Sequence, residues 1–215
     1  DEVARAIAAL LDATGATSVG LDMRAVDPAL FPNVVSALQD AGLDPTRARI
    51  PVSPAAHYMM GGVVTDLHGR STVPGLYAVG ETACTGLHGA NRLASNSLSE
   101  CFVFGARAAA AGLDEPAPPA TPDAAAPAAA RLERPARTTQ EALWRDAGIV
   151  RTRAGLERLL DDPHPLARLI AGCALHREES RGAHQRTDFP ATDPERDHRH
   201  TVIGAGERPH PSRWS

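Results

Sequence analysis

Residues 76–105 read LYAVGETACTGLHGANRLASNSLSECFVFG, and this stretch gives the strongest indication of the fold. It opens with a short apolar run, 76–79, which leads into Gly-Glu and predicts a buried strand followed by a turn. A glycine-rich loop comes next, and Ser97 with Glu100 then forms an S-x-x-E capping box at a helix start. A strand, a loop and a capped helix in this order predict an α/β domain, in which ligands bind beyond the carboxyl ends of the strands.

We expect the helix that begins near Asn96 to pack closely on a sheet. Its small and apolar residues recur at helical spacing, so that they fall on one face. The residues of this face are Leu98, Cys101, Phe102, Gly105, Ala108, Ala109 and Gly112.

The segment before this stretch favours two helices with a short strand between them, within residues 1–50. The first helix is expected to stop at Gly15, the strand to span 18–23, and the second helix to span 28–41 with Asp27 as its cap.

The segment after it begins with a Pro- and Ala-rich run, 114–135, which cannot sustain a helix and predicts an extended linker. Helical spacing then returns in three places up to residue 190, so an all-α part follows the α/β part. The last residues, 191–215, are expected to form an irregular tail. The expected helices span 138–146, 154–161 and 166–178, and a further strand is expected at 62–65.

The composition excludes several classes of function. Of the 215 residues, 43% are hydrophobic and 22% are charged, as in an ordinary globular protein, and the net charge is −4. A mildly acidic chain lacks the clustered basic face of a nucleic-acid binder, so we expect no nucleic-acid partner. All 22 basic residues are arginine, which excludes Schiff-base and P-loop lysine chemistry.

The three cysteines lack CxxC spacing, which argues against disulfides and against a cysteine-based metal site. We therefore expect a cytoplasmic protein without a metal. No apolar run approaches the roughly 18 residues that a membrane span needs, so no span is expected. The sequence also lacks G-x-G-x-x-G, so a bound dinucleotide would need a pyrophosphate loop from elsewhere.

Three groups of residues could carry chemistry. Glu81 follows the apolar run and could accept ribose hydroxyls at a sheet edge, or it could be an ordinary turn residue. His57 precedes Gly61 and Gly62, which would let backbone approach a flat ring; it could bind substrate or belong to the core. Arg92 could clamp a carboxylate in bidentate fashion, or it could be solvated. The free amides of the helix start that follows would favour an anion, such as a phosphate or the charged edge of a reduced flavin.

Residues 57–105 resemble the flavin-binding segment of the succinate dehydrogenase, fumarate reductase and L-aspartate oxidase flavoprotein family. The shared motifs are HY-x-x-GG from His57, VPGLYA-x-GE ending at Glu81, and HGANR-L-x-x-NSL from His88. EESRGAH, ending at His184, and the DFP that follows resemble the helical C-terminal domain of the same family. Within the family, AAHY and TGLHGANRLASNSL are similar to the L-aspartate oxidase branch.

The resemblance implies FAD as cofactor and L-aspartate, a dicarboxylate, as substrate. It implies that His57 and Arg92 hold the substrate carboxylates and that Glu81 binds the FAD ribose. Ser97 and Leu98 would donate amides to the pyrimidine edge of the flavin. The implied reaction is hydride transfer from Cα of L-aspartate to the flavin, giving iminoaspartate for NAD biosynthesis, with O2 or fumarate as the electron acceptor.

The resemblance also implies a division into domains. Residues 1–50 would be a capping-domain remnant, 51–113 the last section of the FAD-binding domain, and 136–190 a helical C-terminal domain. We expect the pyrophosphate loop and the catalytic arginine of the family to precede Asp1, so no catalytic residue is assigned and Arg5 is not that arginine.

The chain by itself is therefore expected to be inactive and to depend on an N-terminal FAD-binding region; an oligomer is compatible with this. Two alternatives stay open. The chain could belong to a succinate dehydrogenase or fumarate reductase flavoprotein, or it could be a non-catalytic fragment with the same fold.

Overall fold

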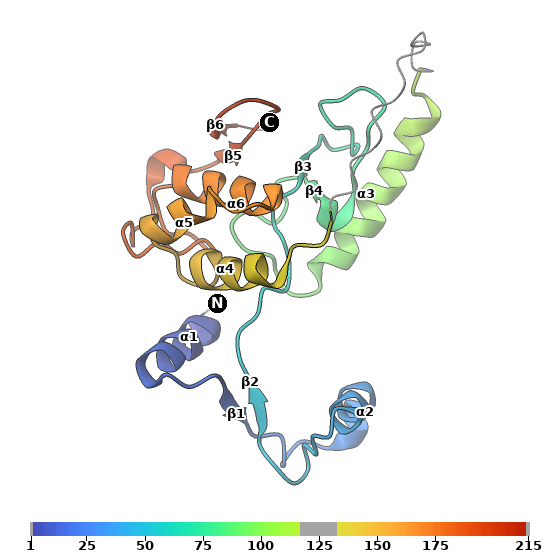
Figure 1. The fold of residues 1–215 in the computed structure, drawn as a ribbon. Coiled ribbons are helices and arrows are strands. Elements are labelled where there is room, and N and C mark those ends of the chain that lie inside the picture. Colours follow the sequence, from blue (N-terminus) through green and yellow to red (C-terminus); the bar gives the residue numbers. More distant parts are fainter. Residues whose placement is uncertain (1, 117–132, 214–215) are drawn as a thin grey trace. The chain divides into compact units, whose positions relative to one another are not determined.

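The computed structural model describes residues 2–116 and 133–213, so most of the predicted linker lies outside the described residues. The chain forms two compact units, residues 1–55 (unit 1) and 56–215 (unit 2). Helices and short strands occur in both units (Figure 1), in agreement with the predicted mixture of helix and sheet. Within the described ranges, no helix is long and apolar enough to cross a membrane.

Unit 1 begins as the sequence predicts. The helix α1 spans Glu2–Thr14, and Gly15 follows it with a φ of 66°, a conformation that suits glycine at a helix end. The strand β1 (Val19–Leu21) lies within the predicted range and pairs antiparallel with β2 (Ile50–Val52). Ile50 is 4% exposed and is a core residue of this unit.

The helix predicted over 28–41 is divided in two. Asp27 accepts a backbone hydrogen bond, as expected of a cap, but it caps a short 3₁₀ turn, η1 (Pro28–Leu30). The α-helix proper, α2, spans Pro32–Asp40. Proline lacks an amide hydrogen and disfavours a helical conformation for the residue before it, and Phe31 accordingly has φ −135° and ψ 54°.

The first sheet of unit 2 is a parallel pair of strands. The strand β3 (Val63–Val64) lies within the predicted strand at 62–65, and its partner is β4 (Ala83–Cys84). Between them lies a 3₁₀ turn, η2 (Gly80–Thr82), which contains Glu81.

The strand predicted at 76–79 is wrong. Leu76 N donates to Val73 O at 3.0 Å across Pro74-Gly75, and Gly75 has a φ of 77°, as in a type II turn. This turn reverses the chain, so that Ala78 N donates to Gly69 O at 2.9 Å. The apolar run is therefore paired locally with the residues just before it and does not join β3 and β4.

The helix α3 (Asn96–Leu113) begins where expected, but the predicted capping box is wrong. Ser95 precedes the first turn in a left-handed conformation, with a φ of 65°, and makes no side-chain cap. Glu100 is 2% exposed, and its carboxylate is held by side chains of other segments. It is therefore not available to cap the helix start.

The apolar face predicted for α3 is also wrong. The buried residues of this helix are Glu100, Phe104 and Ala111, whereas Leu98 and Phe102 are 64% and 77% exposed. The burial of the Glu100 carboxylate sets the rotation of the helix. The helix packs against η2, where a Cβ on Gly80 would lie 2.8 Å from Cys101 Sγ.

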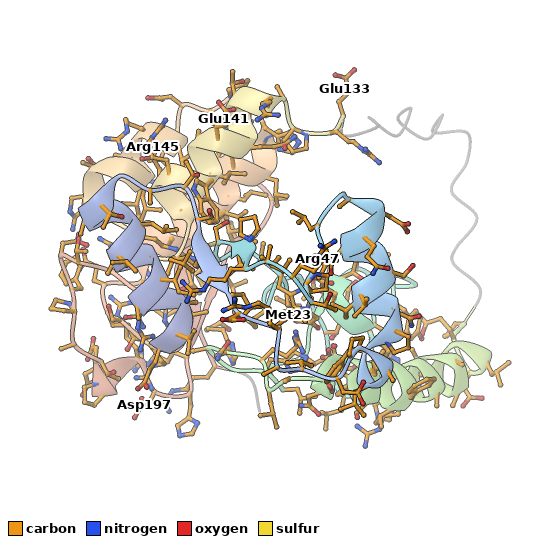
Figure 2. The ribbon with its side chains drawn as sticks, turned by 90° about the horizontal axis from the view of Figure 1, so that it is seen from below. Met23, Arg47, Glu133, Glu141, Arg145 and Asp197 are labelled. Atoms are coloured by element: carbon orange, nitrogen blue, oxygen red, sulfur yellow. The ribbon has the colours of Figure 1, made fainter. Side chains whose placement is uncertain are left out.

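The predicted helices of the C-terminal part are confirmed. They are α4 (Arg137–Ala147), α5 (Arg153–Leu159) and α6 (Pro165–His176), and they pack against one another (Figure 1). Their shared core contains Leu156, Leu159, Ala167 and Ala171, none more than 1% exposed. Glu141 and Arg145 lie one turn apart on the exposed side of α4 (Figure 2).

The tail is more regular than the sequence predicts. It contains a 3₁₀ turn, η3 (Pro194–Arg196), and two strands, β5 (His200–Val202) and β6 (His210–Ser212), which pair antiparallel. Proline within β6 and histidines at both strand starts obscured the strand pattern, because proline cannot donate to a ladder.

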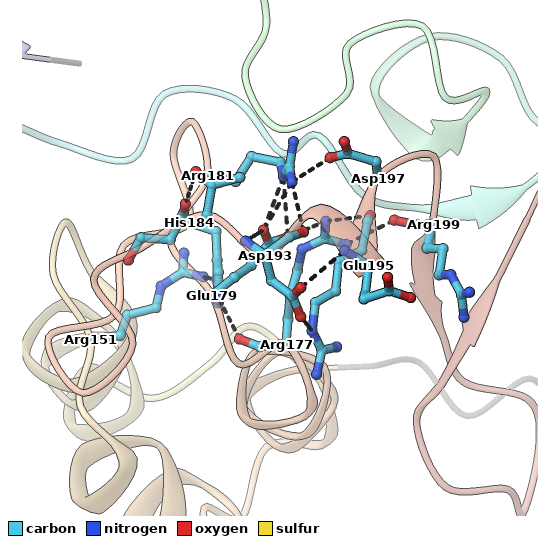
Figure 3. A network of polar contacts seen from close by, with 12 residues as sticks. Arg151, Arg177, Glu179, Arg181, His184, Asp193, Glu195, Asp197 and Arg199 are labelled. Atoms are coloured by element: carbon cyan, nitrogen blue, oxygen red, sulfur yellow. Dashed lines mark hydrogen bonds and ion pairs between the residues drawn. The ribbon is translucent and has the colours of Figure 1, made fainter.

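A buried carboxylate, that of Glu179, organises the chain after α6 (Figure 3). Glu179 is 0% exposed and pairs with Arg177 at 2.5 Å and with Arg181 at 3.1 Å. It also accepts from Asp193 N at 3.0 Å, and Arg181 in turn pairs with Asp197 at 2.6 Å. Loss of one partner of a buried charge pair is costly, so this cluster holds the loop after α6 firmly.

His184 belongs to the same region (Figure 3). Its Nδ1 lies 2.8 Å from Arg151 Nη1, and its Nε2 lies 2.9 Å from Arg177 O. A guanidinium can only donate, so Nδ1 accepts and Nε2 carries the hydrogen donated to Arg177 O. Burial lowers the pKa of His184 to about 4, and the charges of Arg151, Arg177 and Arg186 act in the same direction.

We predict that His184→Gln flattens the pH dependence of the free energy of unfolding. The folded pKa of about 4 lies below the ordinary 6.5, so the unfolded chain takes up the proton first as the pH falls. The stabilisation is complete above pH 6.5 and is lost as the pH falls towards 4, by on the order of 3 kcal/mol. Glutamine offers the same acceptor and donor without titrating. Urea unfolding across this pH range measures the slope.

The control is His68→Gln, at an exposed histidine. His176 and His200, whose pKa values burial also lowers, remain in all three proteins, so their contribution cancels. An unchanged slope in His184→Gln would show that His184 does not fold as the neutral form.

Candidate active site

The candidate site is built around the carboxylate of Glu100, in α3. Its Oε1 accepts from Thr85 Oγ1 at 2.7 Å. Its Oε2 lies 2.8 Å from His88 Nε2 and accepts from Tyr58 OH at 3.2 Å. Thr85 and His88 flank the start of the glycine-rich loop, and Tyr58 follows His57, so one carboxylate joins three segments that are distant in sequence.

These contacts are shielded from water. The side chains of Glu100 and His88 are 1% and 6% exposed. Burial, followed by the negative charge of Glu100, raises the pKa of Tyr58 to about 12, so Tyr58 is a neutral phenol that donates its hydrogen. A carboxylate only accepts, so His88 Nε2 carries a hydrogen; His88 Nδ1 is buried and has no partner among the described residues.

Arg92 lies over the ring of Tyr58. Its guanidinium carbon is 4.5 Å from the ring centroid, and Nη1 donates to Leu93 O at 3.3 Å. Its Nε is buried and finds no hydrogen-bond partner within the described ranges. Buried donors in native proteins are nearly always satisfied, so the arrangement fits an acceptor from a ligand, such as a carboxylate.

His57 and Glu81 lie beside the segment on which Arg92 stacks. His57 is exposed and precedes Tyr58, the residue on which Arg92 stacks. Glu81 Oε1 accepts from Met59 N at 3.0 Å, which fixes the backbone beside His57. A carboxylate has about four acceptor positions, so Glu81 can also take a ribose hydroxyl. The structure thus gathers His57, Glu81 and Arg92 around the Tyr58–Met59 peptide.

Gly62, the second glycine of the pair after this peptide, lies close to another part of the chain, whereas nothing lies within 4 Å of a Cβ added at Gly61. A Cβ on Gly62 would lie 2.3 Å from Thr82 O, because β3 begins there against the chain that leads into β4. The close approach that glycine allows at this position is therefore to the chain itself, and the expected approach to a flat ring is not needed to explain it.

Ser97 and Leu98 lie in the first turn of α3, ahead of Glu100. Leu98 N donates to Ser95 O at 3.2 Å, and Leu98 is exposed while Ser97 is half-buried. A non-glycine residue with positive φ costs energy and is found preferentially at functional sites, and Ser95 occupies that position at the helix start. The amides of a helix N-terminus suit the electron-rich edge of a flavin, and the Leu98 amide would share its hydrogen between such an edge and Ser95 O.

Sequence reasoning missed Tyr58, His88 and Glu100 as a group. Glu100 was interpreted as a cap because its spacing from Ser97 matches that motif. The signal that could have identified the group is polar: a tyrosine, a histidine and a glutamate each interrupt an otherwise small or apolar stretch, and such groups pair when they are buried.

Two family models match the chain. Residues 1–98 match the FAD binding domain, and residues 160–212 match the fumarate reductase flavoprotein C-terminal domain. Among solved structures, an E. coli quinol fumarate reductase chain superposes with a TM-score of 0.71 at 28% identity, over 91% of this chain and 43% of that chain. The Mycobacterium smegmatis Sdh1 complex gives 0.71 at 28% identity, over 98% of this chain and 46% of that chain. By these matches the chain is similar to the flavoprotein chains of fumarate reductase and of the Sdh1 complex.

Relatives by sequence narrow the class. An L-aspartate oxidase of Rhodospirillum rubrum is 44% identical over 99% of this chain and 86% of its own length. Those of Caulobacter vibrioides and Mycobacterium leprae are 48% and 44% identical over 90% and 94% of this chain. The chain belongs to the L-aspartate oxidase family, whose cofactor is FAD. It spans 41% and 43% of the length of the latter two relatives.

We predict that Glu100→Ala lowers the free energy of unfolding by about 3 kcal/mol, because it leaves the buried donors of Tyr58, Thr85 and His88 without an acceptor. Glu115→Ala is the matched control. Glu115 also accepts from a tyrosine hydroxyl, Tyr77 OH at 2.6 Å, but its side chain is 27% exposed. Its loss should cost about 1 kcal/mol or less, since water can replace it. Urea unfolding measures both, and equal losses would contradict the account.

Proposed function

We propose that this chain supplies the substrate side of an FAD-dependent L-aspartate oxidase, which converts L-aspartate to iminoaspartate in NAD biosynthesis. One observation supports the proposal most: the buried Nε of Arg92 lacks a partner among the described residues, and Arg92 stacks on Tyr58, next to His57. Two donor groups beside Tyr58, one from the preceding residue and one stacked on its ring, suit a substrate with two carboxylates.

His57 and Arg92 would each hold one carboxylate of L-aspartate. Fixing both ends of a four-carbon diacid leaves its Cα–H bond in one orientation, and orientation contributes much of the rate of such a step. In this arrangement His57 is a carboxylate ligand and not the base. No residue of the chain is proposed as the catalytic base.

Glu81 would accept a ribose hydroxyl of FAD, and the amides of Ser97 and Leu98 would face the pyrimidine edge of the flavin. FAD, when bound, supplies the acceptor for the hydride that leaves Cα, and O2 or fumarate then takes the electrons. The chain would hold the substrate next to the flavin edge. Ser97 and Leu98 share α3 with Glu100, and Glu100 fixes Tyr58, on which Arg92 stacks.

We also propose the domain division inferred from the sequence. Residues 1–50 would be a capping-domain remnant, 51–113 the end of an FAD-binding domain, and 136–190 a helical domain. The 215 residues contain no G-x-G-x-x-G, so the grip on the pyrophosphate would come from an N-terminal FAD-binding region. The 215 residues alone would then bind FAD weakly. A cytoplasmic location fits the unpaired cysteines.

The substrate can be tested by flavin bleaching. The protein that carries these residues, loaded with FAD, is mixed without oxygen with L-aspartate or with succinate, and flavin absorbance is followed. We expect bleaching by L-aspartate and little by succinate. Bleaching by succinate only would replace the proposal with a succinate dehydrogenase or fumarate reductase activity, and bleaching by neither would favour a non-catalytic protein.

We make a separate prediction for Arg92 as a ligand of a substrate carboxylate. Arg92→Lys keeps the charge but loses the planar fork, so KM for L-aspartate should rise roughly 10- to 100-fold, as expected for a lost charge-assisted hydrogen bond. Arg107→Lys is the control, because Arg107 is exposed on α3 and stacks on Phe104 at 5.4 Å. Steady-state kinetics measures both, and equal KM values for the two variants would remove Arg92 from the site.

A further inference from the structure

The loop after α6 makes a tight turn over Arg181-Gly182-Ala183-His184. Arg181 N donates to His184 O at 2.7 Å, and His184 N donates to Arg181 O at 3.0 Å. Gly182 has a φ of 56° whereas Ala183 does not have a positive φ, which is the pattern of a type II′ turn and requires glycine at its first central position.

The apex of this turn touches the glycine-rich loop of the candidate site. Ala183 N donates to Ala90 O at 2.8 Å. The approach at Gly182 is so close that a Cβ there would lie 2.5 Å from Ala90 O and 2.7 Å from Ala90 C. Ala90 is two residues before Arg92, so the turn supports the backbone that carries the proposed carboxylate clamp.

The turn is held on both sides. Arg181 is fixed by Glu179 and Asp197, and His184 is fixed by Arg151 and by Arg177 O (Figure 3). Because Glu179 is wholly buried, the turn cannot shift without disturbing a buried charge cluster. It therefore acts as a rigid support and not as a passive surface loop.

We infer that the C-terminal part of the chain positions Arg92 through the contact of Gly182 and Ala183 with Ala90. Gly182 and Ala183 are positioning residues, since they touch the loop that bears Arg92 and make no contact with Arg92 itself in the hydrogen bonds described. This inference rests on the proposed function of Arg92 as a ligand of a dicarboxylate. It extends the site to residues about 90 positions later in the sequence than Arg92.

The first test compares two glycine substitutions in the FAD-loaded protein. Gly182→Ala introduces strain at a positive φ and a clash with Ala90. Gly206→Ala introduces the same kind of strain at a φ of 76°, where nothing lies within 4 Å of the added Cβ. Dissociation constants are measured for L-aspartate, for succinate and for FAD.

We expect Gly182→Ala to weaken dicarboxylate binding about tenfold and to leave FAD affinity within about twofold, which is the size of effect that indirect contacts give. Gly206→Ala should change neither. If the two variants bind dicarboxylates equally well, the inference is overturned. If the unaltered protein binds no dicarboxylate, the proposed function fails instead, so the two failures are distinct.

A second measurement avoids substitution altogether. Saturating L-aspartate or succinate should slow hydrogen exchange at the Ala183 amide at least threefold, because ligand binding that fixes Arg92 also fixes its support, and coupling is reciprocal. The amide of Leu156, in the core of α5, should not change. Exchange at Ala183 that is insensitive to saturating dicarboxylate would contradict the inference.

Discussion

The Glu100 carboxylate is buried, and everything in the candidate site depends on how its charge is satisfied. Three side chains from other segments donate hydrogen bonds to it. Because the carboxylate is shielded from water, loss of any of the three would lower the free energy of unfolding. Satisfying this one group fixes the rotation of α3, the start of the glycine-rich loop and the ring of Tyr58. Arg92 then stacks on a ring that is already in place. The positions of the proposed substrate ligands are thus a consequence of one buried acceptor.

A second buried carboxylate, that of Glu179, performs the same task for the C-terminal part. It gathers Arg177 and Arg181 and so fixes the turn that reaches Ala90. Glu100 lies in α3 and Glu179 follows α6, yet the contacts that each carboxylate holds in place lead to the same loop, around Ala90. The loop is therefore supported on one side by α3 and on the other by the chain after α6. Such double support is what a precise ligand site requires of its backbone.

Much of the fold could be predicted from local pattern. The helices α1, α4, α5 and α6 follow from apolar spacing and from the proline and glycine residues that end them, and these signals are local. The failures are non-local. The apolar run at 76–79 has the composition of a strand, but the Pro74-Gly75 turn pairs it with its own neighbours. The break before Pro32 divided one predicted helix in two.

In the candidate site, too, the local signals could be predicted from the sequence and the long-range contacts could not. His57, Glu81 and Arg92 stand out by residue type beside glycines, and the structure gathers them around one peptide. The partnership of Tyr58, His88 and Glu100 could not be read from spacing, since it joins positions up to 42 residues apart. The link from Gly182 to Ala90 spans still more of the chain. Contacts of this kind depend on the packed fold and leave no periodic trace in the sequence.

Hydrogen exchange in a Glu100→Gln protein tests most directly whether this carboxylate organises the site. Glutamine keeps the size of the side chain but brings two donors to a place that is already surrounded by donors. We expect amides of residues 57–59 and 86–92 to exchange at least about tenfold faster than in the unaltered protein, while those of α5 keep their rates. Unchanged exchange in both segments would contradict the account, because it would show that the loop and the Tyr58 peptide hold their places without Glu100.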